Sequence, residues 1–419
     1  MTNRDLVFKF VGHACVLATY QGQSILFDPW LGSLISGGAV GGYPAFSKLS
    51  QAELDSLVGI HISHIHHDHC CVSDLATLPK NVPVYIGDYL KSDFRSILER
   101  VGFERVVTVP TDVQGVDVGP FRLSIFPKNP EDGSFDSSAV LSAGEKRVYL
   151  SNDCIHPDSF YFLLKKVYGD FEGAFVGFAS VNPYIWNSDY SHCVDVPRKF
   201  SLDEFIDQRQ ETAWQHSAKI AKLLSARWAV PYASSYKFMT KDLAHLNKGF
   251  ASPTEIRRFD LGTARAVCLE HGESLDTSLP TEQLEGSAQG PTLVPPELLS
   301  PSRFDRPHSQ ADLNRLARDV EPIFLGVFRR QEKRWKLPMT IRIRIAAESG
   351  ESFLYYEYDG KRVEARSSAE PDVEMSFQSG LIEDLVSGEL DMVQVYSTFA
   401  VRNTWYRLKI GQMLFTQWV

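Results

Sequence analysis

Short runs of apolar residues, separated by turn residues, occupy the first part of the chain. Residues 6–20 are rich in β-branched and aromatic side chains and predict a strand, Gly22 marks a turn, and residues 24–31 predict a second strand. Helices are predicted at 50–57 and 203–228, the second from its helical periodicity. Further strands are predicted at 83–86, 105–109, 121–126, 138–142, 147–151 and 173–185. Strands punctuated by helices predict an α/β sandwich rather than a helical bundle.

The pattern changes after residue 277. Six prolines among Ser, Gly and Thr make 278–310 a predicted linker. A smaller α+β unit is predicted beyond it, with helices at 311–330 and 381–390 and strands at 340–348, 352–359 and 373–379. We therefore predict three parts, which are a catalytic domain (1–277), the linker (278–310) and a C-terminal α+β domain (311–419).

Composition narrows the class of protein. The 419 residues are 43% hydrophobic, as in a folded globular protein, and the net charge of −9 argues against a nucleic-acid partner. No apolar run reaches the roughly 18 residues of a membrane span, and the first residues do not form a secretory signal. Six scattered cysteines do not form a disulfide scaffold, so we expect a cytoplasmic location.

Residues 57–70 begin as an apolar strand and end in a histidine cluster. His64, His66, Asp68 and His69 form the pattern H-x-H-x-D-H. Alternate residues at a strand end point the same way, so His64 and His66 can reach one metal ion, and the turn that follows lets Asp68 and His69 bind a second. Such ligands suit zinc or iron, and two ions can share one water. The alternative, a histidine-rich loop without metal, is disfavoured by four ligand-type residues in this register.

The cluster and the segments VGHACVL (11–17) and ILFDPWL (25–31) resemble the metallo-β-lactamase superfamily. The resemblance implies an αββα sandwich with a dinuclear metal site, followed here by the smaller α+β domain. It also implies an aspartate that bridges the two metals, and Asp153 matches this position after the strand at 147–151. A turn-capping role for Asp153 is the alternative.

The third ligand of the first metal departs from the family pattern. The family has a histidine between the cluster and the bridging aspartate, but no histidine lies between His69 and His156. This stretch offers Glu131, Asp132 and Asp136, and we predict Asp132 as the ligand, with Glu131 next. A carboxylate at this position shifts the preference from zinc towards iron or manganese.

The resemblance also implies a final histidine ligand near the end of the domain. We predict His245 for this role, with His192 and His216 as weaker candidates. Asp68 and Asp153 are the predicted catalytic residues, because both carboxylates contact the metals.

Several segments together resemble the catalytic half of CMP-N-acetylneuraminate hydroxylase, over most of residues 6–260. They lie at 28–31, 61–69, 131–154, 178–184 and 231–247. This resemblance implies an iron- and O₂-dependent monooxygenase. The family enzyme carries an N-terminal Rieske domain, and we expect no Rieske cluster in this chain. The missing histidine fits di-iron oxygenases of natural-product pathways on the same fold, in which a carboxylate replaces one histidine.

Three functions stay open at this point. The favoured one is a di-iron oxygenase or oxidase acting on a small polar metabolite, with O₂ as co-substrate, iron preferred over zinc or manganese, and electrons from a separate reductase or ferredoxin. The second is a metal-dependent hydrolase of a phosphoester, lactone or amide, which uses a hydroxide shared by the metals. The third is a non-catalytic metalloprotein whose C-terminal domain is the working part.

Other residues are candidates around the metals. Asp28 is expected to orient a ligand imidazole or to form a strand-end turn, and His13 to line the pocket or to be a core residue. The substrate-contact candidates are Asn182, Tyr184, Trp186, Tyr232, Tyr236 and Lys237, each with a core role as the alternative. Residues 373–399 faintly resemble a sterol-carrier-type domain, and a homo-oligomer interface or a lid are equal alternatives for this unit.

Overall fold

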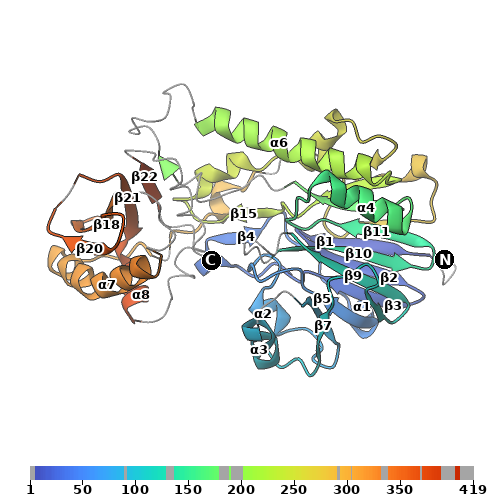
Figure 1. The fold of residues 1–419 in the computed structure, drawn as a ribbon, viewed down its shortest axis with the longest axis horizontal. Coiled ribbons are helices and arrows are strands. Elements are labelled where there is room, and N and C mark those ends of the chain that lie inside the picture. Colours follow the sequence, from blue (N-terminus) through green and yellow to red (C-terminus); the bar gives the residue numbers. More distant parts are fainter. Residues whose placement is uncertain are drawn as a thin grey trace.

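The computed structural model describes residues 5–88, 92–128, 136–178, 188–189, 202–289, 293–302, 304–331, 338–368, 370–387 and 402–405. Two β-sheets pack face to face in the first unit, with helices on their outer faces, and a smaller sheet forms a second unit (Figure 1). The first unit is thus the predicted αββα sandwich of the metallo-β-lactamase type. No helix among the described residues is both long and apolar enough to cross a bilayer.

The first sheet combines an antiparallel hairpin region with a parallel region. Strands β1 to β3 pair antiparallel, whereas β3, β5, β6 and β7 run parallel. In spatial order its strands are β17 (Ser274–Asp276), β1 (Val7–Gly12), β2 (Cys15–Tyr20), β3 (Gln23–Phe27), β5 (Leu57–His61), β6 (Val84–Gly87) and β7 (Val106–Val109).

The second sheet has the same mixed character. Strands β8 to β11 pair antiparallel, and β11, β12, β14 and β16 run parallel. In spatial order its strands are β16 (Arg265–Ala266), β14 (Trp228–Tyr232), β12 (Gly173–Gly177), β11 (Lys146–Leu150), β10 (Ser137–Ala143), β9 (Phe121–Pro127) and β8 (Val116–Val118). A small separate pair consists of β4 (Val40–Gly42) and β15 (Tyr236–Phe238).

Both faces of each sheet are buried, which explains why the strands are apolar almost throughout. In β3, Ile25 packs between the sheets, whereas its neighbour Leu26 faces the helix layer on the other side. In β11, Val148 packs between the sheets and Tyr149 faces outward against helices. The outer helices are α1 (Gln51–Asp55), α2 (Val72–Leu75) and α3 (Ser92–Arg100) beside the first sheet, and α4 (Asp158–Tyr168) and α6 (Leu202–Leu223) beside the second.

The second unit is an α+β layer structure. Its helices are α7 (Gln310–Gln331) and α8 (Ser379–Ser387), and Phe324 and Phe328 of α7 pack on alternate residues of the sheet such as Ile341 and Ile343. In spatial order the strands are β13 (Ser188–Asp189), β22 (Arg402–Trp405), β21 (Val373–Gln378), β18 (Met339–Ala347), β19 (Gly350–Tyr358) and β20 (Val363–Arg366). Strand β13, which precedes α6 in the chain, therefore belongs to the sheet of this unit.

Candidate metal centre

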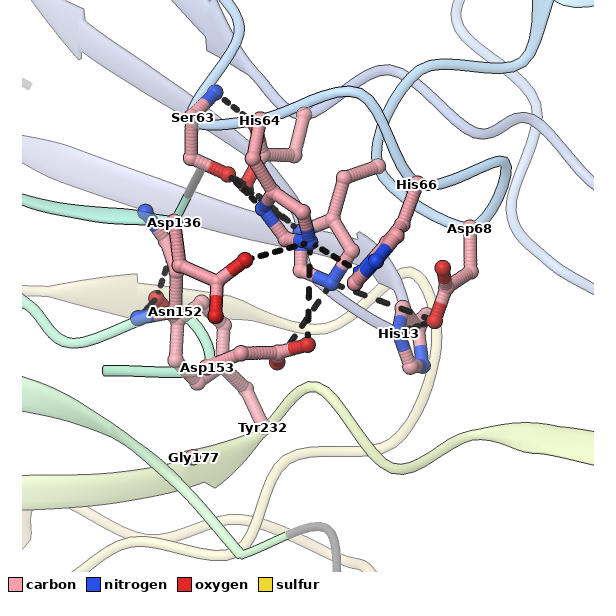
Figure 2. Close-up of polar contacts among 12 residues, drawn as sticks. His13, Ser63, His64, His66, Asp68, Asp136, Asn152, Asp153, Gly177 and Tyr232 are labelled. Atoms are coloured by element: carbon pink, nitrogen blue, oxygen red, sulfur yellow. Dashed lines mark hydrogen bonds and ion pairs between the residues drawn. The ribbon is translucent and has the colours of Figure 1, made fainter. Parts of the chain in front are cut away.

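The histidine cluster lies where strand ends of both sheets meet. Asp28 follows β3 and His64 follows β5, and these strands are parallel neighbours, so both residues leave the sheet at the same edge. Asp153 follows β11 of the other sheet. Asp136 directly precedes β10, whose antiparallel register with β11 brings the start of β10 beside the end of β11. Figure 2 shows the side chains of His64, Asp136 and Asp153 pointing towards one another.

One group of candidate ligands consists of His64, His66 and Asp136, whose ligand atoms lie within 4.8 Å of one another. His64 Nε2 and His66 Nδ1 are 2.8 Å apart, and His64 Nε2 is 3.6 Å from Asp136 Oδ1. Two imidazoles and one carboxylate are a typical ligand set for a first-row transition metal.

Two further groups contain His69, one with His13 and Asp68 and the other with His64 and Asp153. His69 Nε2 lies 3.9 Å from Asp68 Oδ2 and 3.5 Å from Asp153 Oδ1. The other oxygen of Asp153 lies 3.7 Å from His64 Nε2 in the first group. The two oxygens of Asp153 thus face one histidine each, which is the arrangement of a bridging carboxylate.

Hydrogen bonds at Nδ1 orient the rings of His64 and His69 so that each Nε2 can bind a metal ion. Asp28 Oδ2 accepts a hydrogen bond from His69 Nδ1–H at 2.9 Å and another from the Ser63 hydroxyl at 2.7 Å. Because the Ser63 hydroxyl donates its hydrogen bond to Asp28, its oxygen accepts a hydrogen bond from His64 Nδ1–H, 2.9 Å away. Both rings therefore present Nε2 lone pairs, and the buried Nε2 of His69 has no hydrogen-bond partner among the described residues. This donor set fits two metal ions.

The electrostatics of the apo site point the same way. Burial lowers the pKa of His64 to about 4, with a further contribution from the charge of His69. Burial also opposes the charge of His69, but Asp153, Asp68 and Asp28 raise its pKa well above the ordinary value. Burial opposes the charge of Asp153, yet His69 and His64 lower its pKa. These carboxylates need a positive charge beside them, which a metal ion supplies in place of a proton.

The loop that carries Asp153 is fixed by Asn152 and Tyr232. The backbone N–H of Asn152 donates to the Tyr232 hydroxyl at 2.7 Å, and that hydroxyl donates to the Asn152 side-chain oxygen at 2.6 Å. The Asn152 amide group also donates to the Ser137 carbonyl. Gly177 packs against the same loop, because a Cβ there would lie 2.3 Å from the Asn152 carbonyl oxygen. Tyr232 thus has a supporting role in the core.

Left-handed backbone conformations concentrate around the centre. His13, Asp28, Asn152 and Ala233 have φ of 50°, 40°, 48° and 57°. Non-glycine residues rarely adopt such angles and do so where the surrounding structure holds them, often at functional sites. Each of these four residues turns the chain sharply beside the metal ligands or their supports.

The structure brings some predicted site residues together and leaves others apart. Tyr236 is buried, and its ring centroid lies 5.5 Å from that of His13. Lys237 is buried with Nζ 4.2 Å from the centre of the Phe250 ring. Asp132, Glu131, Asn182, Tyr184, Trp186 and His192 lie outside the described residues.

The prediction for the last ligand needs correction. His245 is exposed, and its Nδ1 lies 2.9 Å from the carbonyl oxygen of Asp242, within a 3₁₀ helix away from the other ligands. His216 is on α6 and belongs to none of the described metal groups. Two residues of the site had only a weak signal in the sequence. Asp136 ranked behind Asp132 although it lies next to a strand, and Ser63 was unrecognised although it directly precedes His64.

No protein-family model matches this chain. It is 28% identical over 252 residues to a Mycobacterium tuberculosis protein named as a Rieske 2Fe-2S iron-sulfur protein, covering 59% of this chain and 47% of that one. It is 27% identical over 197 residues to the 4-amino-L-phenylalanyl-(CmlP-peptidyl-carrier-protein) 3-hydroxylase of Streptomyces venezuelae, covering 43% and 35%. It is 25% identical over 259 residues to the cytidine monophosphate-N-acetylneuraminic acid hydroxylase of Mus musculus, covering 55% and 39%.

The match to the mouse enzyme confirms the resemblance seen in the sequence, although the chain spans about half or less of the length of these relatives. Among solved structures, the diiron β-hydroxylase CmlA from Streptomyces venezuelae aligns with a TM-score of 0.37 and 20% identity, over 56% of this chain and 45% of that one. An isothiocyanate hydrolase from Delia radicum gut bacteria aligns with a TM-score of 0.42 and 12% identity, over 64% and 98%.

Two cysteine–histidine pairs in the chain are relevant because the mycobacterial relative is named as a Rieske protein. Cys154 and His156 are spaced C-x-H, and Cys268 and His271 are spaced C-x-x-H, as Rieske ligand pairs are. In the structure His156 Nε2 lies 2.9 Å from the Ser138 hydroxyl instead. Neither pair belongs to a group of converging ligand atoms, and every such group among the described residues includes a residue of the histidine cluster.

Proposed function

We propose that this chain is a di-iron oxygenase that acts on a small polar metabolite with O₂ and with electrons from a separate reductase or ferredoxin. The observation that carries the proposal is Asp136, a carboxylate 3.6 Å from His64 Nε2. The family that the sequence resembles has a histidine in this stretch of the chain instead. Three imidazoles and three carboxylates favour iron over zinc. The proposed ligands are His64, His66 and Asp136 for one iron, Asp68 and His69 for the other, and Asp153 between them.

Two of the similar proteins support an oxygenase, because both are named hydroxylases and are 25–27% identical to this chain over 197 and 259 residues. One acts on a carrier-protein-bound amino acid and the other on a nucleotide sugar. They therefore support hydroxylation as the reaction but do not indicate the substrate.

Two iron ions would supply O₂ activation and electron transfer. Residues around the candidate ligands hold them in position for metal binding. Asp28 and Ser63 fix the ring orientations of His69 and His64, so that little rearrangement accompanies metal binding. Both rings are fully buried, which keeps bulk water away from that side of the centre. Asp153 has one carboxylate oxygen near His64 and the other near His69, so it would contact both ions.

Metal analysis of protein purified without added metal tests the proposal. We expect about two irons per chain and O₂ consumption when a chemical reductant is supplied. Asp136→Ala should lose iron from one position, whereas Asp132→Ala, the matched control, should keep both. Two zinc ions per chain, with no O₂ consumption after anaerobic iron loading, would reject the oxygenase and direct the search to hydrolysis of phosphoesters, lactones or amides.

A further inference from the structure

His13 is a buried histidine beside the proposed centre that belongs to a different part of the chain from the other histidines. It lies in the turn between β1 and β2 and is 1% exposed. Its Nε2 lies 3.1 Å from Asp68 Oδ2 but forms no hydrogen bond of standard geometry among the described residues, and its ring centroid is 5.3 Å from that of His69. Figure 2 shows the ring next to the Asp68 carboxylate.

The other ring nitrogen of His13 fixes its tautomer. The backbone N–H of Ser235 donates to His13 Nδ1 at 3.2 Å. A backbone N–H can only donate, so Nδ1 must accept with its lone pair, and the proton of the neutral ring must lie on Nε2. His64 and His69 are arranged in the opposite way, because both donate from Nδ1 and present Nε2 as an acceptor.

The loop that holds His13 comes from the end of the domain. The Ala233 backbone N–H donates to the His13 carbonyl at 2.8 Å, so residues 233–235 bind both the backbone and the ring of His13. The resemblance implied a last histidine ligand near the end of this domain. The described loop carries Ala233, Ser234, Ser235 and Tyr236, and His245 is exposed elsewhere.

We propose that His13 is a positioning residue that donates a hydrogen bond from Nε2 to the Asp68 carboxylate and so directs this carboxylate to the second metal. From the described residues, that metal then has only Asp68, His69 and Asp153 as ligands. The inference rests on the metal centre of the proposed function, but it requires neither iron nor oxygenase activity.

The competing role is direct coordination. The ligand-type atoms of His13, Asp68 and His69 lie within 4.8 Å of one another, close enough to share an ion. Coordination through Nε2 would place the ring proton on Nδ1, facing the Ser235 N–H, and two donors cannot bond each other. The hydrogen-bond pattern therefore favours the donor role over coordination.

Zinc-loaded full-length protein separates the two roles without any activity assay. The variants are His13→Phe, which removes the donor, and His13→Gln, which retains a side-chain N–H. We expect His13→Phe to weaken binding of the second zinc ion by roughly 10- to 100-fold, as is usual when a supporting partner of a ligand is removed, and His13→Gln to recover most of it. X-ray absorption should show three imidazoles per two zinc ions in the wild type and in both variants.

Other outcomes would overturn the inference. Four imidazoles per two zinc ions in the wild type, falling to three in both variants, would make His13 a ligand. Unchanged zinc affinity in His13→Phe would make it a core residue only. Thermal melting of the apo forms identifies a variant that fails to fold, in which case His13→Gln alone decides. A wild-type chain that binds fewer than two zinc ions rejects the centre itself, whereas a zinc-binding chain without O₂ chemistry rejects only the oxygenase.

Discussion

Replacement of Asp28 by asparagine should weaken the centre from outside the set of metal ligands. The buried carboxylate accepts the Ser63 backbone N–H at 2.7 Å, the Ser63 hydroxyl at 2.7 Å and His69 Nδ1–H at 2.9 Å. Asparagine has the same shape but no charge, and its NH₂ group must face one of these donors. One donor is then left unpaired in the core.

The expected size of the effect follows from these contacts. Hydrogen bonds to a charged group contribute about 1.5–3 kcal/mol each, and an unpaired buried donor costs about 1–3 kcal/mol, so Asp28→Asn should lose about 3 kcal/mol of unfolding free energy. Because His69 also loses the partner that fixes its tautomer, affinity for the second metal should fall by about 10- to 100-fold. Urea unfolding of the apo protein and zinc titration against a competing chelator measure the two quantities.

Asp74→Asn is the matched control. The Asp74 carboxylate is also buried, and it accepts the Leu31 backbone N–H at 2.6 Å and bonds from Ser33. It belongs to none of the described metal groups. We expect a comparable loss of stability with unchanged zinc affinity. Zinc affinity that falls equally in both variants would refute the specific role of Asp28, as would unchanged affinity in Asp28→Asn.

Three further changes test other parts of the structure. Burial lowers the pKa of Lys237 to about 7, so between pH 7 and 10 the unfolded chain binds more protons than the folded chain and stability rises with pH. Lys237→Met should therefore add about 4 kcal/mol at pH 7 and little near pH 10.5, as measured by urea unfolding at each pH. Gly177→Ala places a Cβ against the Asn152 carbonyl and should lower metal content per chain, as measured by elemental analysis, with the fold retained by circular dichroism. Tyr232→Phe leaves the Asn152 N–H without its partner and should lower stability by about 1–3 kcal/mol, and an unchanged thermal midpoint would count against this contact.

The sequence predicts the parts of the site that local pattern encodes. The histidine cluster and its apolar strand follow from spacing and periodicity, and Asp28 follows from its place at a strand end. Asp153 was identified by the family resemblance, as the aspartate after a later strand. Asp136 is different, because three carboxylates in one loop have similar local sequence and only the register of β10 against β11 brings the last one to the histidines.

Long-range pairing explains the remaining differences. His245 was favoured for its place in the sequence, but a 3₁₀ helix holds it at the surface. The tautomer of His13 depends on the Ser235 N–H, 222 residues further along the chain, and no local pattern predicts that contact. Helix α7 and strands β18, β19 and β21 were predicted to within two residues, because alternation in β18 and periodicity in α7 are local features. Strand β20 was not predicted.

The pairing of β1 with β17 has a consequence for how the chain is synthesised and folds. Val7 to Lys9 pair with Ser274 to Asp276, and the Thr277 N–H donates to the Leu6 carbonyl. On a ribosome, β1 can pair with β2 almost at once, but its other edge stays open until residue 276 has emerged. An open strand edge pairs readily with other chains and favours aggregation. A shortened form of the first unit must therefore extend beyond Thr277 to stay monomeric during folding.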